Sequence, residues 1–405
     1  MDNQKPLSGY RIVELATFVA APVCARLLGD WGADVIKVES PAGDAWRTFG
    51  QTMSMPVNED ENPAWEIANT NKRAIAVDLK NPHGQKVLHD LLQTADVFIT
   101  NNRIEALKKI NLDYESLKEK YPRLIYGIVT GFGENGPDVN QPGFDSVAFW
   151  GRSGFLADLV PPGAYPVYSP AGFGDLAVGT ILCGGISTAL LKREKTGKGE
   201  KVSISLFGAS VWLAGLMITS TQSRYQNKYP KERLEGNPMV IPYKTKDGEW
   251  VFLTVIEYDR YWPALCKVIE REDLITDARF KTRLDMLNNR AALIPILEEA
   301  FETKDIAEWL TRLREADIVH VRLQHLREIE NDQQAWANDY LYENTFANGA
   351  KAILPSSPIQ WAEAGALPRQ SGPLLGEHTQ ELLEELGYTQ EQIEELKNQR
   401  AARIR

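Results

Sequence analysis

The sequence predicts an α/β protein, in which an open parallel sheet domain is followed by a smaller α+β domain. Three observations lead to this fold class. Short apolar runs alternate with helical patterns from Tyr10 to Gly133. A polar segment at 221–238 then interrupts the chain, and a hairpin pattern followed by helices begins beyond it. The loops after the apolar runs are rich in glycine and small polar residues, as expected where ligands bind beyond parallel strands.

The first predicted domain, residues 1–220, begins with a buried strand at 10–15, a helix at 22–31 and a second strand at 33–40. This order with short connections is typical of a parallel βαβ unit with a right-handed crossover. The pattern continues with strands at 74–79, 96–100 and 123–133 and a helix at 83–95. We therefore expect an open, Rossmann-like sheet with helices on both faces.

The segment Ser169–Gly185 places one carboxylate, Asp175, between a glycine-containing turn and an apolar helix. Gly172 and Gly174 permit a positive φ and close approach of a ligand. Aspartate is a preferred N-cap residue, so the local pattern alone predicts that Asp175 caps the helix that follows. A turn, a strand and a second apolar helix complete this domain.

Residues 221–238 have the composition of a linker. The second domain, 239–325, starts with a hairpin whose turn is Lys246-Asp247-Gly248. Its helices are expected at 259–270, 290–302 and 304–315. Residues 326–405 are expected to return as loops and helices that pack on the first domain, and they end in one amphipathic helix within 371–396.

Composition excludes several classes of function. A net charge of −10 and a pI near 5.3 argue against a nucleic acid or an anionic membrane as partner. Cys24, Cys183 and Cys266 are far apart and suggest neither a disulfide framework nor a zinc site, and we expect no bound metal. The sequence shows no apolar signal core or membrane-length apolar run, so we expect a cytoplasmic protein.

The loop after the first strand, Ala16–Pro22, lacks the G-x-G-x-x-G pattern that grips a dinucleotide. A dehydrogenase is therefore disfavoured. The sequence also lacks a P-loop, a G-x-S-x-G elbow and an H-E-x-x-H motif.

Eight segments, in order, resemble the class III CoA transferases (the CaiB/BaiF type): LSGYRIVELATFVAAP, WGADVIKVESPAGD, NTNKRAIAVDLKNPHG, ADVFITN, TGFGENGP, GFGDLAVG, KTGKGEKVSISL and GPLLGEHTQELLEELGY. They span nearly the whole chain. Within this family the chain is most similar to the branch of enzymes that act on 2-hydroxy acids in amino-acid fermentation. The segments QAWANDYLY and NPMVIPYKTKD carry this closer resemblance.

The resemblance implies an enzyme that moves CoA from an acyl- or enoyl-CoA to an (R)-2-hydroxy acid with an aryl or branched aliphatic side chain, such as phenyllactate or 2-hydroxyisocaproate. Asp175 matches the family's nucleophile and would form a mixed anhydride and an aspartyl-CoA thioester. CoA thioester is then a substrate, and no permanently bound cofactor is expected. Backbone N–H groups at Gly172–Leu176 or Glu235–Asn237 are candidate oxyanion donors.

The resemblance also implies where CoA and the acyl group lie. Matching CoA contacts are Val19, Ala20, Val77, Asp78, Leu79, Lys80, Asn101, Asn102, Arg103 and Lys109. Ser40 stands where some relatives have arginine, and its contribution is left open. The substrate pocket is expected to involve Gln141, Phe144, Asp145 and Gly174, with Trp150 and Met239 as further candidates.

Several alternatives stay open at this point. The first alternative is an acyl-CoA racemase or epimerase of the same fold. Such racemases carry a catalytic histidine in a G-H-D motif, whereas this chain has Gly143-Phe144-Asp145. Because phenylalanine cannot move a proton, racemisation is disfavoured. The acid could instead be formate, oxalate, succinate or carnitine, or the chain could be a non-catalytic CoA-binding module. The resemblance further implies a homodimer in which each chain forms a ring threaded through the other.

Overall fold

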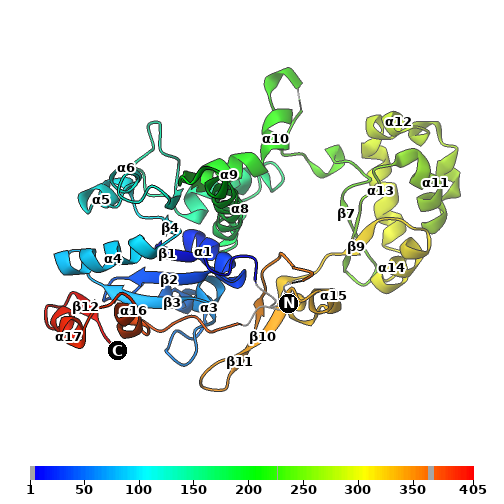
Figure 1. Ribbon diagram of the computed structural model, residues 1–405. Helices are drawn as coiled ribbons and strands as arrows, with labels where there is room; N and C mark the ends of the chain where they lie inside the picture. The colour runs from blue at the N-terminus through cyan, green and yellow to red at the C-terminus, as the bar shows by residue number, and fades with distance from the viewer. Residues whose placement is uncertain (1–4, 226, 364–368) are drawn as a thin grey trace. The chain divides into compact units, whose positions relative to one another are not determined.

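A computed structural model describes residues 5–225, 227–363 and 369–405 (Figure 1). Residues 1–4, 226 and 364–368, which fall in the predicted first domain, linker and return segment, lie outside this description. The chain divides into two compact units. The first combines residues up to Leu156 with Val167–Ser220 and Gln334–Arg405, and the second combines Ala157–Pro166 with Thr221–Gln333.

A seven-stranded sheet forms the centre of the first unit, in the order β12-β3-β2-β1-β4-β5-β6. Its parallel strands are β1 (Arg11–Leu15), β2 (Asp34–Glu39), β3 (Arg73–Val77), β4 (Val97–Thr100), β5 (Ile125–Thr130) and β6 (Lys201–Ser205). The predicted parallel sheet is thus confirmed. Its order reverses between β1 and β4, and ligands of such sheets bind at this switch point.

The edge strand β12 (Ala402–Arg403) is antiparallel to β3, with Ala402 opposite Val77. The sequence analysis did not expect this strand, because two residues are too few to show a strand pattern. The observed sheet is therefore parallel with one antiparallel edge.

Helices cover both faces of the sheet (Figure 1). On one face α1 (Ala20–Asp30), α3 (Pro63–Asn69) and α8 (Phe173–Thr196) share a core with Ile12 and Val97. The other face includes Val13 and Phe98 and is covered by α4 (Pro82–Thr94), α5 (Ile104–Lys109), α6 (Tyr114–Leu117), α16 (Thr379–Glu385) and α17 (Gln390–Asn398). Successive strand residues point to opposite faces, which is why both cores draw on the same strands.

Further helices of this unit are α2 (Trp46–Phe49), α9 (Leu206–Leu213) and α10 (Gly215–Ser220). The helices α7 (Phe155–Asp158) and α15 (Gln333–Ala337) each span a boundary between the units in the sequence. Among the described residues one helix, α8, is long and apolar enough to cross a membrane. Its buried residues, including Val178, Leu182 and Ile186, belong to the core shared with α1. This packing makes α8 a core helix of the unit.

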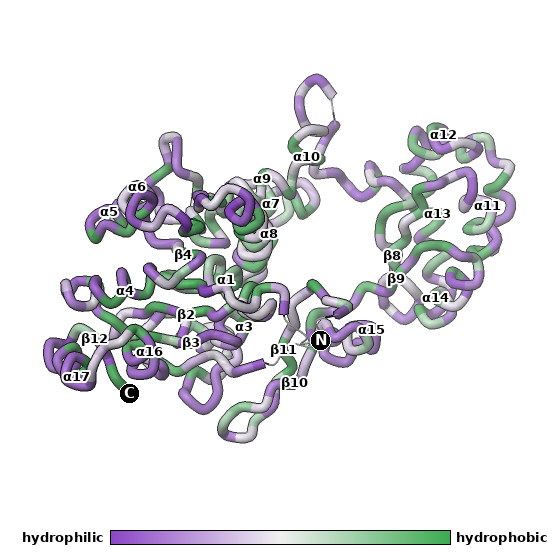
Figure 2. The backbone as a smooth tube through the Cα atoms, in the orientation of Figure 1, coloured by the Kyte–Doolittle hydropathy of each residue, from purple (hydrophilic) through white to green (hydrophobic). Residues whose placement is uncertain are grey.

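Two expectations for the C-terminal region were wrong. A β-hairpin, β10 (Leu341–Thr345) and β11 (Lys351–Pro355), stands where only loops and helices were expected. Its turn carries Asn348-Gly349, with Gly349 at φ +82°, which is a recognised hairpin signal. The single amphipathic helix predicted at the end is two helices, α16 and α17, separated at Gly387 with φ +84°. Figure 2 shows α17 as largely hydrophilic, in line with a narrow buried stripe.

The second unit contains an antiparallel sheet, β7 (Pro242–Lys244), β8 (Trp250–Leu253) and β9 (His320–Arg322). The predicted hairpin is present as β7 and β8, with Gly248 at φ +86° in its turn. The helices are α11 (Tyr258–Val268), α12 (Arg283–Asn288), α13 (Arg290–Phe301) and α14 (Ile306–Glu315). They enclose a core of their own that contains Tyr243, Phe301 and Trp309.

Candidate active site

A cavity of about 210 Å³ lies at the switch point of the large sheet. It is bordered by the loop after β1, the loop after β4 and the loop after β5, and it contains Asp175 from the start of α8. The lining residues that the sequence analysis singled out are Val19, Ala20, Asn101, Asn102, Arg103, Gln141, Phe144 and Asp175. The structure thus brings the expected nucleophile together with three of the expected binding loops.

A second cavity, of about 300 Å³, continues along the strand ends. Thr17 and Asn102 line both cavities. The expected residues Val77, Asp78, Leu79 and Lys80 line this second cavity, as does Ser40, whose role was left open. The two cavities together follow the carboxyl ends of β3, β2, β1 and β4.

Asp175 is not the N-cap that the local pattern predicted. Helix α8 begins at Phe173, and its N-cap is Gly172 in the left-handed region, with φ +69°. Asp175 is therefore the third helical residue, and its side chain makes no cap hydrogen bond. Because Gly172 starts the helix before Asp175, the Asp175 carboxylate does not cap the helix and lines the cavity instead.

The Asp175 carboxyl has a raised pKa of about 7, first because of burial and second because of the negative charge of Asp145. Burial also raises the pKa of Asp145 to about 6, while the nearby N–H groups of Gly174 and Gly172 lower it. Asp145 opens a short π-helix, Asp145–Gly151, that packs against α8. Two carboxyl groups with raised pKa values in one place are typical of a reactive site rather than a structural ion pair.

The side chains of Asn101 and Asp44 hold the loop after β1, which lines the first cavity. Asn101 fixes Thr17 in both directions: the Thr17 N–H donates to Asn101 Oδ1 at 3.0 Å, and Asn101 Nδ2 donates to the Thr17 carbonyl at 2.7 Å. The Phe18 N–H donates to Asp44 Oδ1 at 3.2 Å. The side-chain amide of Asn101, which was expected to contact CoA, therefore binds the backbone of the loop after β1.

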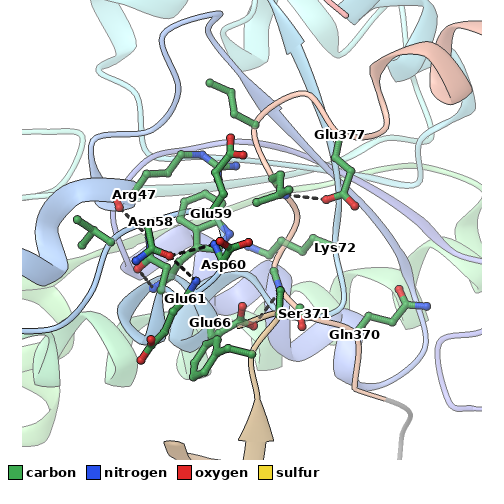
Figure 3. A pocket seen from close by; sticks show the side chains of 18 of the residues that line it. Arg47, Asn58, Glu59, Asp60, Glu61, Glu66, Lys72, Gln370, Ser371 and Glu377 are labelled. Carbon is green, nitrogen blue, oxygen red and sulfur yellow. Dashed lines mark hydrogen bonds between the residues drawn. The ribbon is translucent and has the colours of Figure 1, made fainter. Parts of the chain in front are cut away.

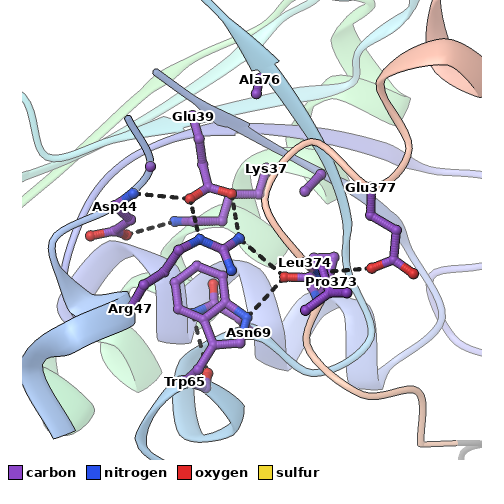
Figure 4. Close-up of polar contacts among 12 residues, drawn as sticks. Lys37, Glu39, Asp44, Arg47, Trp65, Asn69, Ala76, Pro373, Leu374 and Glu377 are labelled. Atoms are coloured by element: carbon purple, nitrogen blue, oxygen red, sulfur yellow. Dashed lines mark hydrogen bonds and ion pairs between the residues drawn. The ribbon is translucent and has the colours of Figure 1, made fainter. Parts of the chain in front are cut away.

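Asp44 belongs to a buried network of charges (Figure 4). Asp44 Oδ2 lies 3.0 Å from Lys37 Nζ, which also donates to Glu14 at 2.8 Å. Glu14 in turn accepts from Lys72 at 2.6 Å. Glu39 accepts from the Asp44 N–H at 3.0 Å. All five residues are buried, so the network anchors the loop from inside the sheet.

Several expected site residues lie elsewhere. Lys109 is exposed at the end of α5, and neither it nor the buried pair Asp145 and Gly174 lines either cavity. Trp150 is packed in the core beside α8, and Met239 is packed in the core of the second unit, and neither side chain lines either cavity. The Glu235–Asn237 segment, a candidate source of oxyanion donors, belongs to the second unit.

A larger cavity, of about 620 Å³, holds none of the expected site residues (Figure 3). It lies among the 47–62 segment, α3 and the chain at 370–378. Glu66 lines it, and burial raises the pKa of this carboxyl to about 7.

The cavity-lining residues that sequence reasoning did not single out include Thr17, Phe18 and Asn140, and Asp44 lies behind the lining. Two of these residues could have been found from their position, because Phe18 directly precedes Val19 and Asn140 directly precedes Gln141. Within the described ranges no group of three or more His, Cys, Asp or Glu side chains could hold a metal ion.

Comparison with known proteins places this site in context. The model of CoA-transferase family III matches residues 7–379. The chain is 40% identical over 398 residues to the (R)-2-hydroxy-4-methylpentanoate CoA-transferase of Clostridioides difficile, covering 98% of this chain and 99% of that protein. It is 39% identical over 407 residues to the cinnamoyl-CoA:phenyllactate CoA-transferase of Clostridium sporogenes, covering 100% and 99%. A solved CaiB/BaiF family protein from Brucella suis superposes with a TM-score of 0.79 at 30% identity, covering 95% of this chain and 100% of that one.

Proposed function

The chain belongs to CoA-transferase family III, and from this premise we propose that it moves CoA from an acyl- or enoyl-CoA to an (R)-2-hydroxy acid with an aryl or branched aliphatic side chain. The protein is a CoA-transferase. Two relatives at 40% and 39% identity over the full chain are named for such acids, which supports this substrate class. CoA enters as a thioester substrate.

In the proposed reaction the Asp175 carboxylate attacks the thioester carbonyl, the C–S bond breaks, and CoA leaves as a thiolate. The thiolate then attacks the aspartyl carbonyl of the mixed anhydride, which releases the donor acid and leaves an aspartyl-CoA thioester. The acceptor carboxylate attacks this thioester, and the CoA thiolate finally attacks the acceptor's acyl carbon to free Asp175. One thioester is exchanged for another throughout. N–H groups at the start of α8 are the proposed oxyanion donors.

The two adjoining cavities suit an extended CoA chain. We place the nucleotide end near Val77–Lys80 and the thioester end beside Asp175, with Thr17 and Asn102 between them. Lys80 and Arg103 bring positive charge near the phosphates. Lys109 is too far along α5 to line either cavity, and we leave it out of this proposal.

The observation that carries the proposal is that Asp175 lines the cavity at the switch point together with the CoA-facing loops. The test is exchange of labelled acid into acyl-CoA. Wild type should catalyse exchange, and Asp175→Asn should abolish it, while the exposed control Asp158→Asn should keep it. Hydroxylamine trapping should modify position 175 only in the presence of acyl-CoA; modification elsewhere would refute the mechanism.

A homodimer of interlocked chains in the cytoplasm completes the proposal. Helices α8 to α10 expose a row of large apolar side chains, which a second chain would cover: Ile181, Leu191, Val211, Trp212, Leu213, Leu216 and Ile218. Light scattering should give twice the mass of 45.4 kDa. A monomer at micromolar concentration would contradict the dimer without touching the assignment of Asp175.

A further inference from the structure

Phe18 has a backbone conformation that needs support. Its φ is +62°, in the left-handed region that residues other than glycine rarely adopt. Such conformations persist where the surroundings fix them, and they are frequent at ligand sites. Here Asp44 Oδ1 accepts from the N–H of Phe18 at 3.2 Å and from that of Trp46 at 2.9 Å.

The support is rigid because of what lies behind it. Asp44 pairs with Lys37 (Figure 4). The Lys37 ammonium also donates to the Ala16 carbonyl at 3.0 Å, so one buried lysine holds Ala16 directly and Phe18 through Asp44. Thr17, the residue before Phe18, is clamped by Asn101. The backbone that carries the Phe18 ring is therefore held at Ala16, Thr17 and Phe18.

The ring that this backbone presents lines the cavity of the nucleophile. Phe18 and Phe144 meet edge to face, with ring centroids 5.3 Å apart and planes at 82°. Both line the same cavity as Asp175. Phe144 is 56% exposed, although large apolar side chains usually gain by burial. A half-buried Phe18 ring and an exposed Phe144 ring in the cavity of Asp175 form a surface that can receive an apolar group.

On the premise of the proposed function, we propose that Phe18 and Phe144 form the subsite for the side chain of the acyl group and select acids that carry an aromatic ring. An aromatic side chain in this subsite can pack edge to face or offset against both rings, at the centroid distances such pairs prefer. An aliphatic side chain of similar size gains burial but not this aromatic contact. Because donor and acceptor acids are both attached at Asp175 in turn, one subsite serves both.

The test compares two acceptor acids on the full-length enzyme, 3-phenyl-2-hydroxypropanoate and 2-hydroxy-4-methylpentanoate, with one saturating CoA donor. Wild type should show a higher kcat/KM for the aromatic acid. Phe144→Leu and Phe18→Leu should each lower the aromatic-to-aliphatic ratio of kcat/KM by roughly 2- to 10-fold, the range of aromatic pair energies. The loss should lie mainly in the KM of the aromatic acid.

Phe132→Leu is the matched control, because Phe132 packs against Phe207 and does not line the cavity. It should leave the ratio unchanged. An unchanged ratio in Phe144→Leu, whose exposed side chain can be replaced without emptying a core, would overturn the inference whether or not Phe18→Leu folds. Failure of the proposed function looks different, because wild type would then transfer CoA to neither acid.

Discussion

A β-carbon built on Gly174 would lie 2.2 Å from Asp145 Oδ1 and 2.4 Å from Cγ of Phe149. The residue before Asp175, the proposed nucleophile, can therefore only be glycine while the π-helix keeps its place against α8. The Asp145 and Phe149 side chains of the π-helix lie directly against the Gly174 backbone, next to Asp175. The conformational freedom of Gly174 matters less than its lack of a side chain.

Gly174→Ala should push the Asp145 side chain or the Phe149 ring aside. Overpacking of this kind lowers the free energy of unfolding by about 1–3 kcal/mol. A displacement near 1 Å at the nucleophile should lower kcat by about 100-fold. Both are measured by denaturant unfolding and initial rates.

Gly184→Ala in the same helix provides the control, because a β-carbon there meets nothing within 4 Å. It should hold or raise stability by up to about 1 kcal/mol, since alanine is the better helix former. Equal losses in the two variants would show that the contact with Asp145 does not matter.

The interaction of Asp145 with Asp175 predicts a pH dependence. In the proposed reaction Asp175 must be ionised to attack, and its pKa is raised to about 7, so kcat/KM should increase with pH and level off above that value. Asp145→Asn removes the negative charge that helps to raise this pKa. The rising limb should then move to lower pH, giving a larger share of full activity at pH 6.

Asp138→Asn serves as the comparison, because Asp138 lies on the loop after β5 and pairs with Arg152 instead. Its pH profile should match wild type. Since coupled carboxyl groups titrate as a pair, the shift is read as a change in one apparent pKa of the pair. A rising limb that stays in place in Asp145→Asn would contradict the coupling.

The parallel sheet could be predicted from the sequence, but the contacts between loops could not. Continuous apolar strands such as the one containing Ile12 and Val13 are typical of buried parallel strands, and they predicted the sheet. The two residues of β12 were too short to show a pattern. The pairing of Asp44 with Phe18, 26 positions apart, depends on how two loops meet.

The start of α8 is a second feature that the sequence did not predict, although it depends only on neighbouring residues. Aspartate after glycine predicts an N-cap at Asp175, and the residue types are right for it. The helix nevertheless begins at Phe173, because Gly172 adopts the left-handed conformation that lets the chain turn earlier. Because Gly172 has a φ of +69°, Asp175 lies inside the helix and lines the cavity instead of capping the helix. Residue propensities do not predict this φ angle.

The buried network around Asp44 predicts a large effect on stability. Asp44→Ala would leave Lys37, whose side chain is 0% exposed, with one carboxylate fewer and would remove the acceptor of two N–H groups. Breaking a buried ion pair from one side lowers the free energy of unfolding by about 3–5 kcal/mol. Asp44→Asn keeps an acceptor oxygen and should lose less.

The matched control is Lys351→Ala, which breaks the pair with Glu343 on the β10–β11 hairpin. Both side chains of that pair are well exposed, at 60% and 48%, so the expected loss is below about 1 kcal/mol. Denaturant unfolding of the three variants measures the difference. Similar losses for Asp44→Ala and Lys351→Ala would show that the network does not anchor the loop.

Glu66 lines the cavity of about 620 Å³, and burial raises the pKa of its carboxyl from 4.5 to about 7 in the folded protein. Between these values the folded state holds more protons than the unfolded state, so the free energy of unfolding falls as pH rises across this window and stays low above it. A shift of this size corresponds to about 3 kcal/mol. Glu66→Gln removes the titration and can still accept the N–H of Gly372, which wild type binds at 2.8 Å. Unfolding measured at pH 5 and pH 8 should therefore differ less in Glu66→Gln than in wild type. Asp60→Asn, an exposed carboxylate of the same cavity, should keep the wild-type difference, and an equal change in both variants would rule out burial of Glu66 as the cause.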